Sequence, residues 1–190
     1  MAGYNLNLTG ETISEPSSGF DPLPPGKYAV SVYDAEAGEF GPNGVNGGRP
    51  NLQVQFRVSD GQAGANRRIF QTVGLFPSWA PKEKGDTPKD NFTFYQFFAA
   101  VQGKDEKEFR AEVKEAAESK KGNLTLPDAE DLLGREVELT LGIENDVYAF
   151  NKAREDDPDV VQDDFKRNSV KNIKAIGKAQ AKAKSEVHRL

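Results

Sequence analysis

Strict alternation of apolar and polar residues in the segment NLQVQFRVSDG, residues 51–61, constrains the fold more than any other feature of the chain. Alternate side chains of a β-strand point to opposite faces, so a period of two predicts a strand with one buried and one exposed face. The Asp60-Gly61 pair predicts a turn at its end. The apolar residues that would share the buried face are Leu52, Val54, Phe56 and Val58. The segment therefore predicts a half-buried β-sheet.

The same alternation recurs elsewhere in the chain. Predicted strands cover residues 27–36, 51–61, 66–76, 135–144 and 168–176. Each run is rich in β-branched or aromatic residues, and loops rich in Gly, Pro or Asp separate several of them. The chain therefore has three strands, a long interruption, and then closing strands.

Capping residues predict two helices in the interruption, at 90–103 and 105–122. The first contains FTFYQFF, residues 92–98, with five of the chain's eighteen aromatic residues. Phe92 and Tyr95 lie off the main helical stripe, so either could line the edge of a groove. The residues that share the stripe at helical spacing are Phe94, Phe97, Phe98 and Val101. We expect this stripe to be core and to plug one end of a barrel.

Three strands, helices and a closing pair are the chain order of an OB-fold, a five-stranded Greek-key barrel. The predicted class is therefore mainly β, with a helical insert between strands three and four. A five- or six-stranded sandwich with one helix would give a similar pattern. The predicted organisation is a flexible arm (1–25), an OB-fold-like domain (26–176), its helical insert (90–122), its long loop between strands four and five (144–167), and a basic tail (177–190).

Composition removes several classes of chemistry. The chain has no Cys and a single His, His188, which excludes disulfides, Cys/His zinc sites, thiol catalysis and His-dependent triads. The segment PDVVQDDFK, 158–166, has the letters of a metal-dependent nuclease, but four residues between its acids cannot supply two neighbouring strands. We expect no catalytic residue, metal or cofactor. Without a signal-like start or an 18-residue apolar stretch, we expect a cytosolic protein that does not enter membranes.

The formal net charge of -5 is unevenly distributed. From Lys166 to the C-terminus there are eight Lys or Arg residues against one acid, whereas residues 155–164 contain six acids. A basic end beside an acidic block is typical of a chain that meets a polyanion under some regulation, and a solvated tail is the commoner alternative. Charge alone therefore leaves both explanations open.

Aromatic and cationic residues outside the predicted core are the candidate binding site. Single-stranded nucleic acid needs this mixture, because each base has a face to stack on and each nucleotide a phosphate to neutralise. Many of them fall on the second and third strands and in the two long loops, where OB-folds bind oligonucleotides. The candidate DNA-binding residues are Phe40, Arg49, Arg57, Arg68, Phe70, Trp79, Tyr148, Phe150, Lys152, Arg154, Lys166, Arg167 and Lys171; Phe76 is a further candidate.

Over residues 24–176 the chain resembles a family of small phage-encoded proteins, long described as a domain of unknown function and regarded as OB-fold-like single-stranded DNA-binding proteins. The segments that carry the resemblance are PPGKYAVSVYDAE, NLQVQFRVSDGQAGANRRIF, FTFYQFFAAVQG, LLGREVELTLGIE and NSVKNIKAI. The resemblance implies a non-catalytic protein of phage replication or recombination in the bacterial cytoplasm. A phage recombinase, nuclease or replication enzyme would be its partner, besides single-stranded DNA.

Two points limit that reading. Many single-strand binders end in an acidic tail with a terminal aromatic residue that recruits enzymes, whereas this chain ends AKAKSEVHRL. The Gly-rich loop, the long arm and the acidic body also fit an alternative, a phage structural or protein-interaction component without DNA binding.

Overall fold

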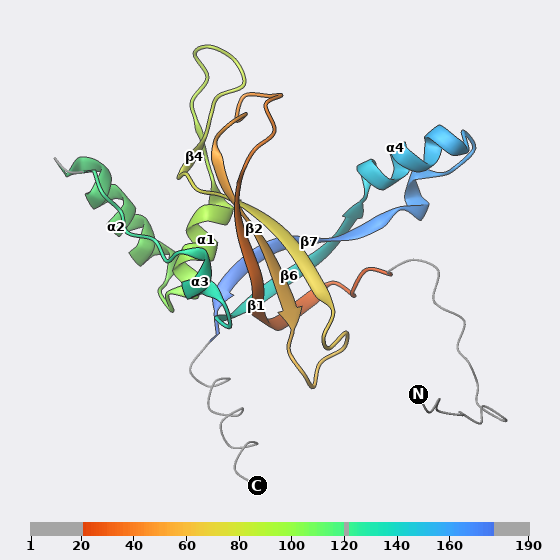
Figure 1. The fold of residues 1–190 in the computed structure, drawn as a ribbon, viewed down its shortest axis with the longest axis horizontal. Coiled ribbons are helices and arrows are strands. Elements are labelled where there is room, and N and C mark those ends of the chain that lie inside the picture. Colours follow the sequence, from red (N-terminus) through yellow and green to blue (C-terminus); the bar gives the residue numbers. More distant parts are fainter. Residues whose placement is uncertain (1–20, 120–121, 177–190) are drawn as a thin grey trace, which may run out of the picture.

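A five-stranded antiparallel sheet forms the centre of the computed structural model, which describes residues 21–119 and 122–176 (Figure 1). Its strands, in spatial order, are β3 (Arg68–Gly74), β2 (Pro50–Val58), β1 (Gly26–Glu39), β6 (Glu136–Asn145) and β7 (Lys166–Ala175). The fourth long strand, β6, thus returns to lie beside the first, which is Greek-key order. A separate two-stranded sheet joins β4 (Ser78–Trp79) to β5 (Lys89–Asp90). The prediction of a mainly β protein is confirmed.

Helices occupy the long connection between β3 and β6 and the connection between β6 and β7. The first connection contains α1 (Phe92–Val101), α2 (Glu106–Glu118) and α3 (Ala129–Leu132). The second contains α4 (Val147–Asp156) and a 3-10 turn, η1 (Gln162–Asp164). The two helices predicted between β3 and β6 are confirmed as α1 and α2. None of the helices in the described residues is long and apolar enough to cross a membrane.

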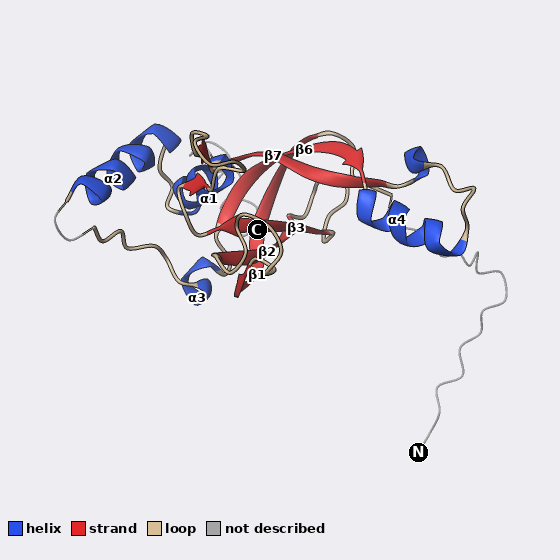
Figure 2. Ribbon diagram, turned by 90° about the horizontal axis from the view of Figure 1, so that it is seen from above, coloured by secondary structure: helices blue, strands red, loops and turns tan. Residues whose placement is uncertain are grey.

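The sheet is open, which corrects the expectation of a closed barrel. Within the described residues, β3 and β7 are edge strands and do not pair with each other. Helix α1 packs against both of them (Figure 2). Its Phe97 ring lies 6.2 Å from the Phe56 ring on the inner face of β2. Large aromatic side chains therefore fill the space across which the two edge strands would have to meet.

The aromatic segment of α1 is core, as predicted. The side chains of Phe94, Phe97, Phe98 and Val101 are all buried. Each buried ring contributes on the order of 1.5 to 3 kcal/mol through the apolar surface that it removes from water. Tyr95 is buried too, with its ring 5.3 Å from Phe94, so it does not line a groove, and only Phe92 of the segment's rings is exposed.

The start of α1 is fixed by a buried asparagine. The Asn91 side-chain oxygen accepts a hydrogen bond from the Phe94 amide, as an N-cap does. Its amide nitrogen donates to the carbonyls of Gly74 and Phe76 at 3.1 and 2.9 Å. One polar side chain therefore joins the helix to the chain that leaves β3 without remaining unsatisfied in the core.

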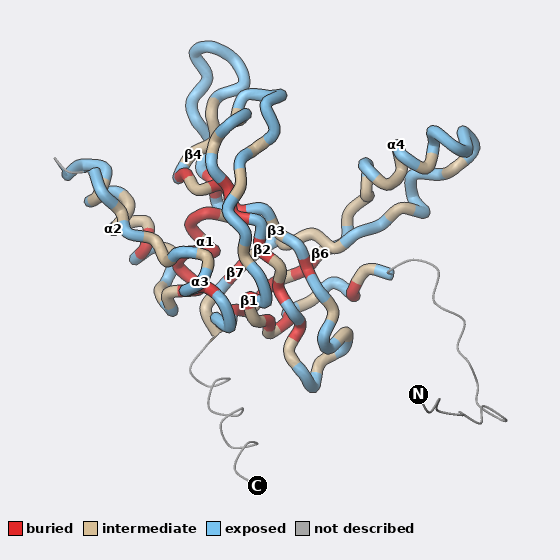
Figure 3. Tube along the Cα trace, viewed as in Figure 1, coloured by how far each residue is buried: buried red, intermediate tan, exposed pale blue. Residues whose placement is uncertain are grey.

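A ribbon of β6 and β7 projects beyond the rest of the sheet. Strand β1 pairs with β6 only as far as Gly26 with Leu141, whereas β6 and β7 stay paired out to Asn145 with Lys166. The ribbon ends in α4, far from the sheet and largely exposed (Figures 1 and 3). We call residues 142–169 the arm. The segment 144–167 was expected to be a loop, but it contains helix α4. Asp146 caps the start of this helix, and its side chain accepts a hydrogen bond from the Ala149 amide.

Residues 21–25 lie against the body of the protein. Leu23 is buried in the core cluster, and its amide and carbonyl both bond to the Asn168 side chain at 2.8 Å. The Tyr28 hydroxyl donates to the Pro24 carbonyl. Two expected segments lie outside the described residues: residues 1–20 of the flexible N-terminal segment and the basic tail, 177–190.

Candidate nucleic-acid interface

The outer face of β1, β2 and β3 brings aromatic and cationic side chains together. We call Tyr33, Asp34, Gln55, Arg57, Arg68 and Phe70 the sheet-face patch. Tyr33 is 43% exposed and Phe70 is 68% exposed, although both are large rings on a regular sheet. Antiparallel pairing sets the rows, with Arg57 opposite Arg68 and Gln55 opposite Phe70. Sequence alternation had predicted that Arg57, Arg68 and Phe70 share this face.

Both arginines of the patch lie over one tyrosine ring. The guanidinium carbon of Arg68 is 4.1 Å from the centroid of the Tyr33 ring, and that of Arg57 is 5.4 Å away. Among the described residues, neither guanidinium has a carboxylate within ion-pair distance. Two like charges side by side repel, and here the electron-rich face of a ring is what stabilises them. The pair is therefore available to an anion.

Tyr33, Asp34 and Gln55 are the members of the patch that were not predicted as site residues, and Tyr33 is the one ring among them. A β-bulge between Val32 and Asp34 shifts the register of β1 against β2. The bulge leaves consecutive residues, Tyr33 and Asp34, both exposed, whereas unbroken alternation would turn one of them inward. The alternation did put Tyr33 on the outer face, but its position beside Arg57 and Arg68 depends on the pairing of three strands.

Phe40, Arg49 and Trp79 form a second group, together with Phe76. The Phe40 ring lies 5.9 Å from Phe76 and 5.7 Å from Trp79. The Arg49 guanidinium lies 3.5 Å above the Phe76 ring and donates to the Ser78 carbonyl and the Asn46 side chain. Phe76 is buried, and the other three are half-buried. These contacts hold the loop between β1 and β2 against β4, so much of each side chain is used in packing.

Three cations on the arm or at its base are paired with acids. Arg167 lies 2.8 Å and Lys171 3.5 Å from the Glu144 carboxylate, and Lys166 lies 2.9 Å from Asp163. The hydrogen bond from Arg167 is the main cause that lowers the pKa of Glu144 below its ordinary value; partial burial opposes the shift and Lys171 adds to it. These three predicted contacts to DNA therefore already have carboxylate partners.

The three aromatic residues of the arm divide into a packed pair and one exposed ring. The Phe150 ring packs edge-on against the Phe165 ring, with 6.0 Å between their centroids. The guanidinium carbon of Arg154 lies 6.0 Å from the centroid of the Phe150 ring. Tyr148 is 77% exposed, and Lys152, one turn further along α4, is exposed too. On the arm, Tyr148, Lys152 and Arg154 therefore remain open to a ligand.

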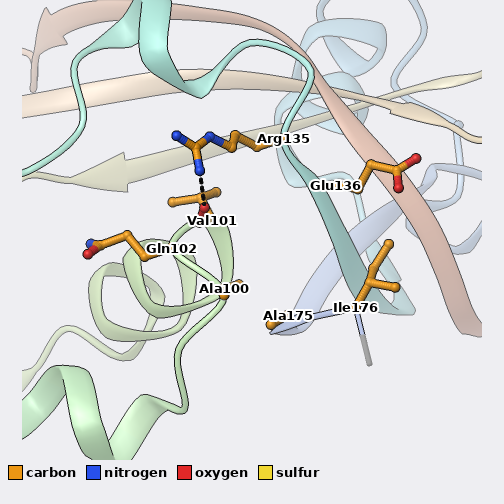
Figure 4. Close-up of a pocket in the computed structure, with 8 residues that line it drawn as sticks. Ala100, Val101, Gln102, Arg135, Glu136, Ala175 and Ile176 are labelled. Carbon is orange, nitrogen blue, oxygen red and sulfur yellow. Dashed lines mark hydrogen bonds between the residues drawn. The ribbon is translucent and has the colours of Figure 1, made fainter. Parts of the chain in front are cut away.

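A hollow of about 300 Å³ lies elsewhere, at the C-terminal end of α1 (Figure 4). Arg135 stands at its rim and donates to the Val101 carbonyl at 3.3 Å. Its lining residues are Ala100, Val101, Gln102, Gly103, Arg135, Glu136, Ala175 and Ile176. In residues 21–119 and 122–176, no group of three or more His, Asp or Glu side chains is placed to hold a metal ion. The hollow brings together no predicted site residue.

Comparison with known proteins does not assign the chain to a family. No protein-family model matches it, and no curated protein is similar to it in sequence. On chemical grounds the sheet-face patch is the best candidate site, because it places two exposed rings beside two cations that have no carboxylate partner among the residues that the structure describes.

Proposed function

We propose that this protein binds single-stranded DNA without catalysis and with low sequence specificity. The observation that carries the proposal is the pair Arg57 and Arg68, which lie over the exposed Tyr33 ring and have no carboxylate partner in the described part of the chain. A stacked base gains about 1 to 3 kcal/mol, and the guanidinium groups would neutralise the phosphates beside it. Phe70, 68% exposed on the same face, offers a second ring.

The fold supports the same proposal. OB-folds are partly open, five-stranded Greek-key barrels that bind oligonucleotides on the face of strands two and three and with the loops that follow strands one and four. The patch lies on β1, β2 and β3, and the sheet has Greek-key order. We propose an OB-fold-like barrel that α1 holds open between β3 and β7. The β1–β2 loop and the arm would then border the bound strand.

Biological context follows from the resemblance in sequence. The protein would act in phage replication or recombination, in the cytoplasm of the bacterial host, with a phage recombinase, nuclease or replication enzyme as its partner. Its net charge of -5 does not oppose this role, because affinity depends on the charges along the bound strand. Binding should weaken with salt, by a logarithmic slope of about 0.7 for each phosphate neutralised.

A titration tests the proposal directly. Fluorescence polarisation of labelled oligo-dT would be measured at two salt concentrations with the wild type and with an Arg57→Ala/Arg68→Ala variant. A Lys107→Ala/Lys114→Ala variant removes two exposed cations from α2 and is the matched control. We expect salt-sensitive binding that only the arginine variant loses. Absence of binding by the wild type at low salt would refute the proposal.

One observation supports a second candidate function, that of a phage structural or protein-interaction component. Apolar side chains are exposed on the arm and beside the acidic block, at Ile143, Val147, Tyr148 and Val161. Exposed apolar groups with a charged rim are typical of protein contacts. Co-sedimentation with phage particles, together with no binding of DNA, would favour this function.

A further inference from the structure

Asp34 is the one acid of the sheet-face patch, which is unexpected for a surface proposed to bind phosphates. Its carboxylate is exposed, and among the described residues no Lys or Arg nitrogen lies within 4 Å of it. A carboxylate repels phosphates. An acid on this face therefore disfavours the sugar-phosphate backbone nearby and favours a ligand group that donates hydrogen bonds.

A chain of hydrogen bonds orients the polar groups between the two rings. Arg68 donates to the side-chain oxygen of Gln55 at 3.3 Å, and the amide nitrogen of Gln55 donates to Asp34 Oδ2 at 3.1 Å. The side-chain oxygen of Gln55 therefore faces Arg68, and its amide nitrogen faces Asp34. Asp34 Oδ1 receives no hydrogen bond from a described residue and remains an open acceptor beside Tyr33 and opposite the row of Phe70.

The bases differ in what they offer such an acceptor. Cytosine, adenine and guanine each carry an exocyclic amino group, and a carboxylate accepts well from the N4 amino group of cytosine. Thymine has only a ring N–H between two carbonyl oxygens, which an ionised carboxylate cannot approach without repulsion. A base stacked on Tyr33 or Phe70 would turn its edge toward Asp34 and Gln55.

We infer that the sheet-face patch prefers bases with an amino group over thymine, and that Asp34 determines this preference by accepting a hydrogen bond from that group. The inference rests on the proposed function, since it concerns the same site. It makes binding weakly selective by base type, without recognition of a defined sequence.

Competition between oligo-dC and oligo-dT tests the inference, because both are pyrimidine strands of nearly equal size and cytosine is unprotonated near pH 8. We expect the wild type to bind oligo-dC about fivefold more tightly than oligo-dT, the gain of one charge-assisted hydrogen bond in an exposed site. Asp34→Asn should bring the ratio close to one. Its affinity for oligo-dT should rise, since a repelling charge is lost.

Glu36→Gln is the matched control. Glu36 is exposed on the same strand and pairs with Gln53, the next outward residue of β2, so the change removes one charge nearby by an equally conservative substitution. It should raise affinity for both oligonucleotides equally and keep their ratio. Thermal unfolding curves would show that both variants fold like the wild type.

The outcomes separate the inference from the proposed function. Equal and measurable affinities of the wild type for the two oligonucleotides would overturn the inference and leave the function intact. A preference that persists in Asp34→Asn would show that another group distinguishes the bases, which also overturns it. Failure of the wild type to bind either oligonucleotide would refute the proposed function and the inference together.

Discussion

The sheet-face patch and the arm contain the same kinds of residue and use them differently. On the sheet, Arg57 and Arg68 have a tyrosine ring for a neighbour and, among the described residues, no carboxylate within ion-pair distance. On the arm and at its base, Arg167 and Lys171 share Glu144. A count of cations would favour the arm as the site for a polyanion, since it holds four (Lys152, Arg154, Lys166 and Arg167) against the two arginines of the patch. The difference teaches that only cations without an acidic partner add to the attraction.

Rigidity also distinguishes the two regions. The patch stands on three paired strands whose inner faces are in the core, with Phe56 and Val58 fully buried beneath it. Helix α4 has no buried residue and ends a two-stranded ribbon. Side chains on a packed sheet lose little further freedom when a ligand binds, whereas those on the arm must be ordered. We therefore expect the sheet to supply most of the binding free energy.

The largest expected effect is the loss of both patch arginines. Arg57→Ala/Arg68→Ala should weaken oligo-dT binding about 30-fold or more, because two phosphate contacts and the cation–π support of Tyr33 are lost. Lys166→Ala/Arg167→Ala removes as many charges from the arm and should change affinity by less than about threefold. Polarisation titrations at one salt concentration compare them. Equal losses from the two pairs would contradict the distinction between the regions.

Tyr33 and Tyr148 allow the same comparison with rings. Tyr33→Ala should weaken binding about tenfold, the contribution of one stacked base, and Tyr33→Phe should bind nearly as the wild type does. Tyr148→Ala should have a smaller effect, although Tyr148 is the more exposed ring at 77%. A greater loss from Tyr148→Ala in the same titration would place the main stacking site on the arm.

Glu144→Gln should make the arm more like the sheet. The change frees Arg167 and Lys171 of their shared carboxylate. We expect affinity for oligo-dT to rise about two- to threefold at low salt, an effect that added salt should remove. Unchanged affinity at low salt would mean that the bound strand does not reach this part of the arm.

The smallest expected effect is on stability in acid. The pKa of Glu144 is lowered in the folded protein, so its ion pairs stabilise the fold fully above the ordinary pKa of a glutamate and lose that contribution as pH falls through the lowered pKa. The group is partly exposed, so the contribution is small. Hydrogen exchange of the amides of 142–145, followed from pH 6 to pH 3, should show protection falling in the wild type more than in Glu144→Gln.

Local pattern predicted the five strands of the main sheet, the two helices of the insert and the buried stripe of α1, because these depend on side chains a few residues apart. The bulge at Tyr33 and the ion pairs of Glu144 depend on partners 21 or more residues away, which periodicity does not reveal. Barrel closure failed as a prediction for a similar reason. Closure requires β3 and β7 to meet, but the aromatic rings of α1 lie between them.

Folding kinetics follow from the pairing of β1 with β6. Gly26 lies opposite Leu141, so the middle of the sheet forms only after more than a hundred residues of chain have closed into a loop. Helix α1 and the meander of β1, β2 and β3 are local and can form first. Until β6 and β7 arrive, the rings of α1 lack one wall of their core, and such exposed apolar surface drives association of partly folded chains. We therefore expect slow refolding whose yield falls as protein concentration rises.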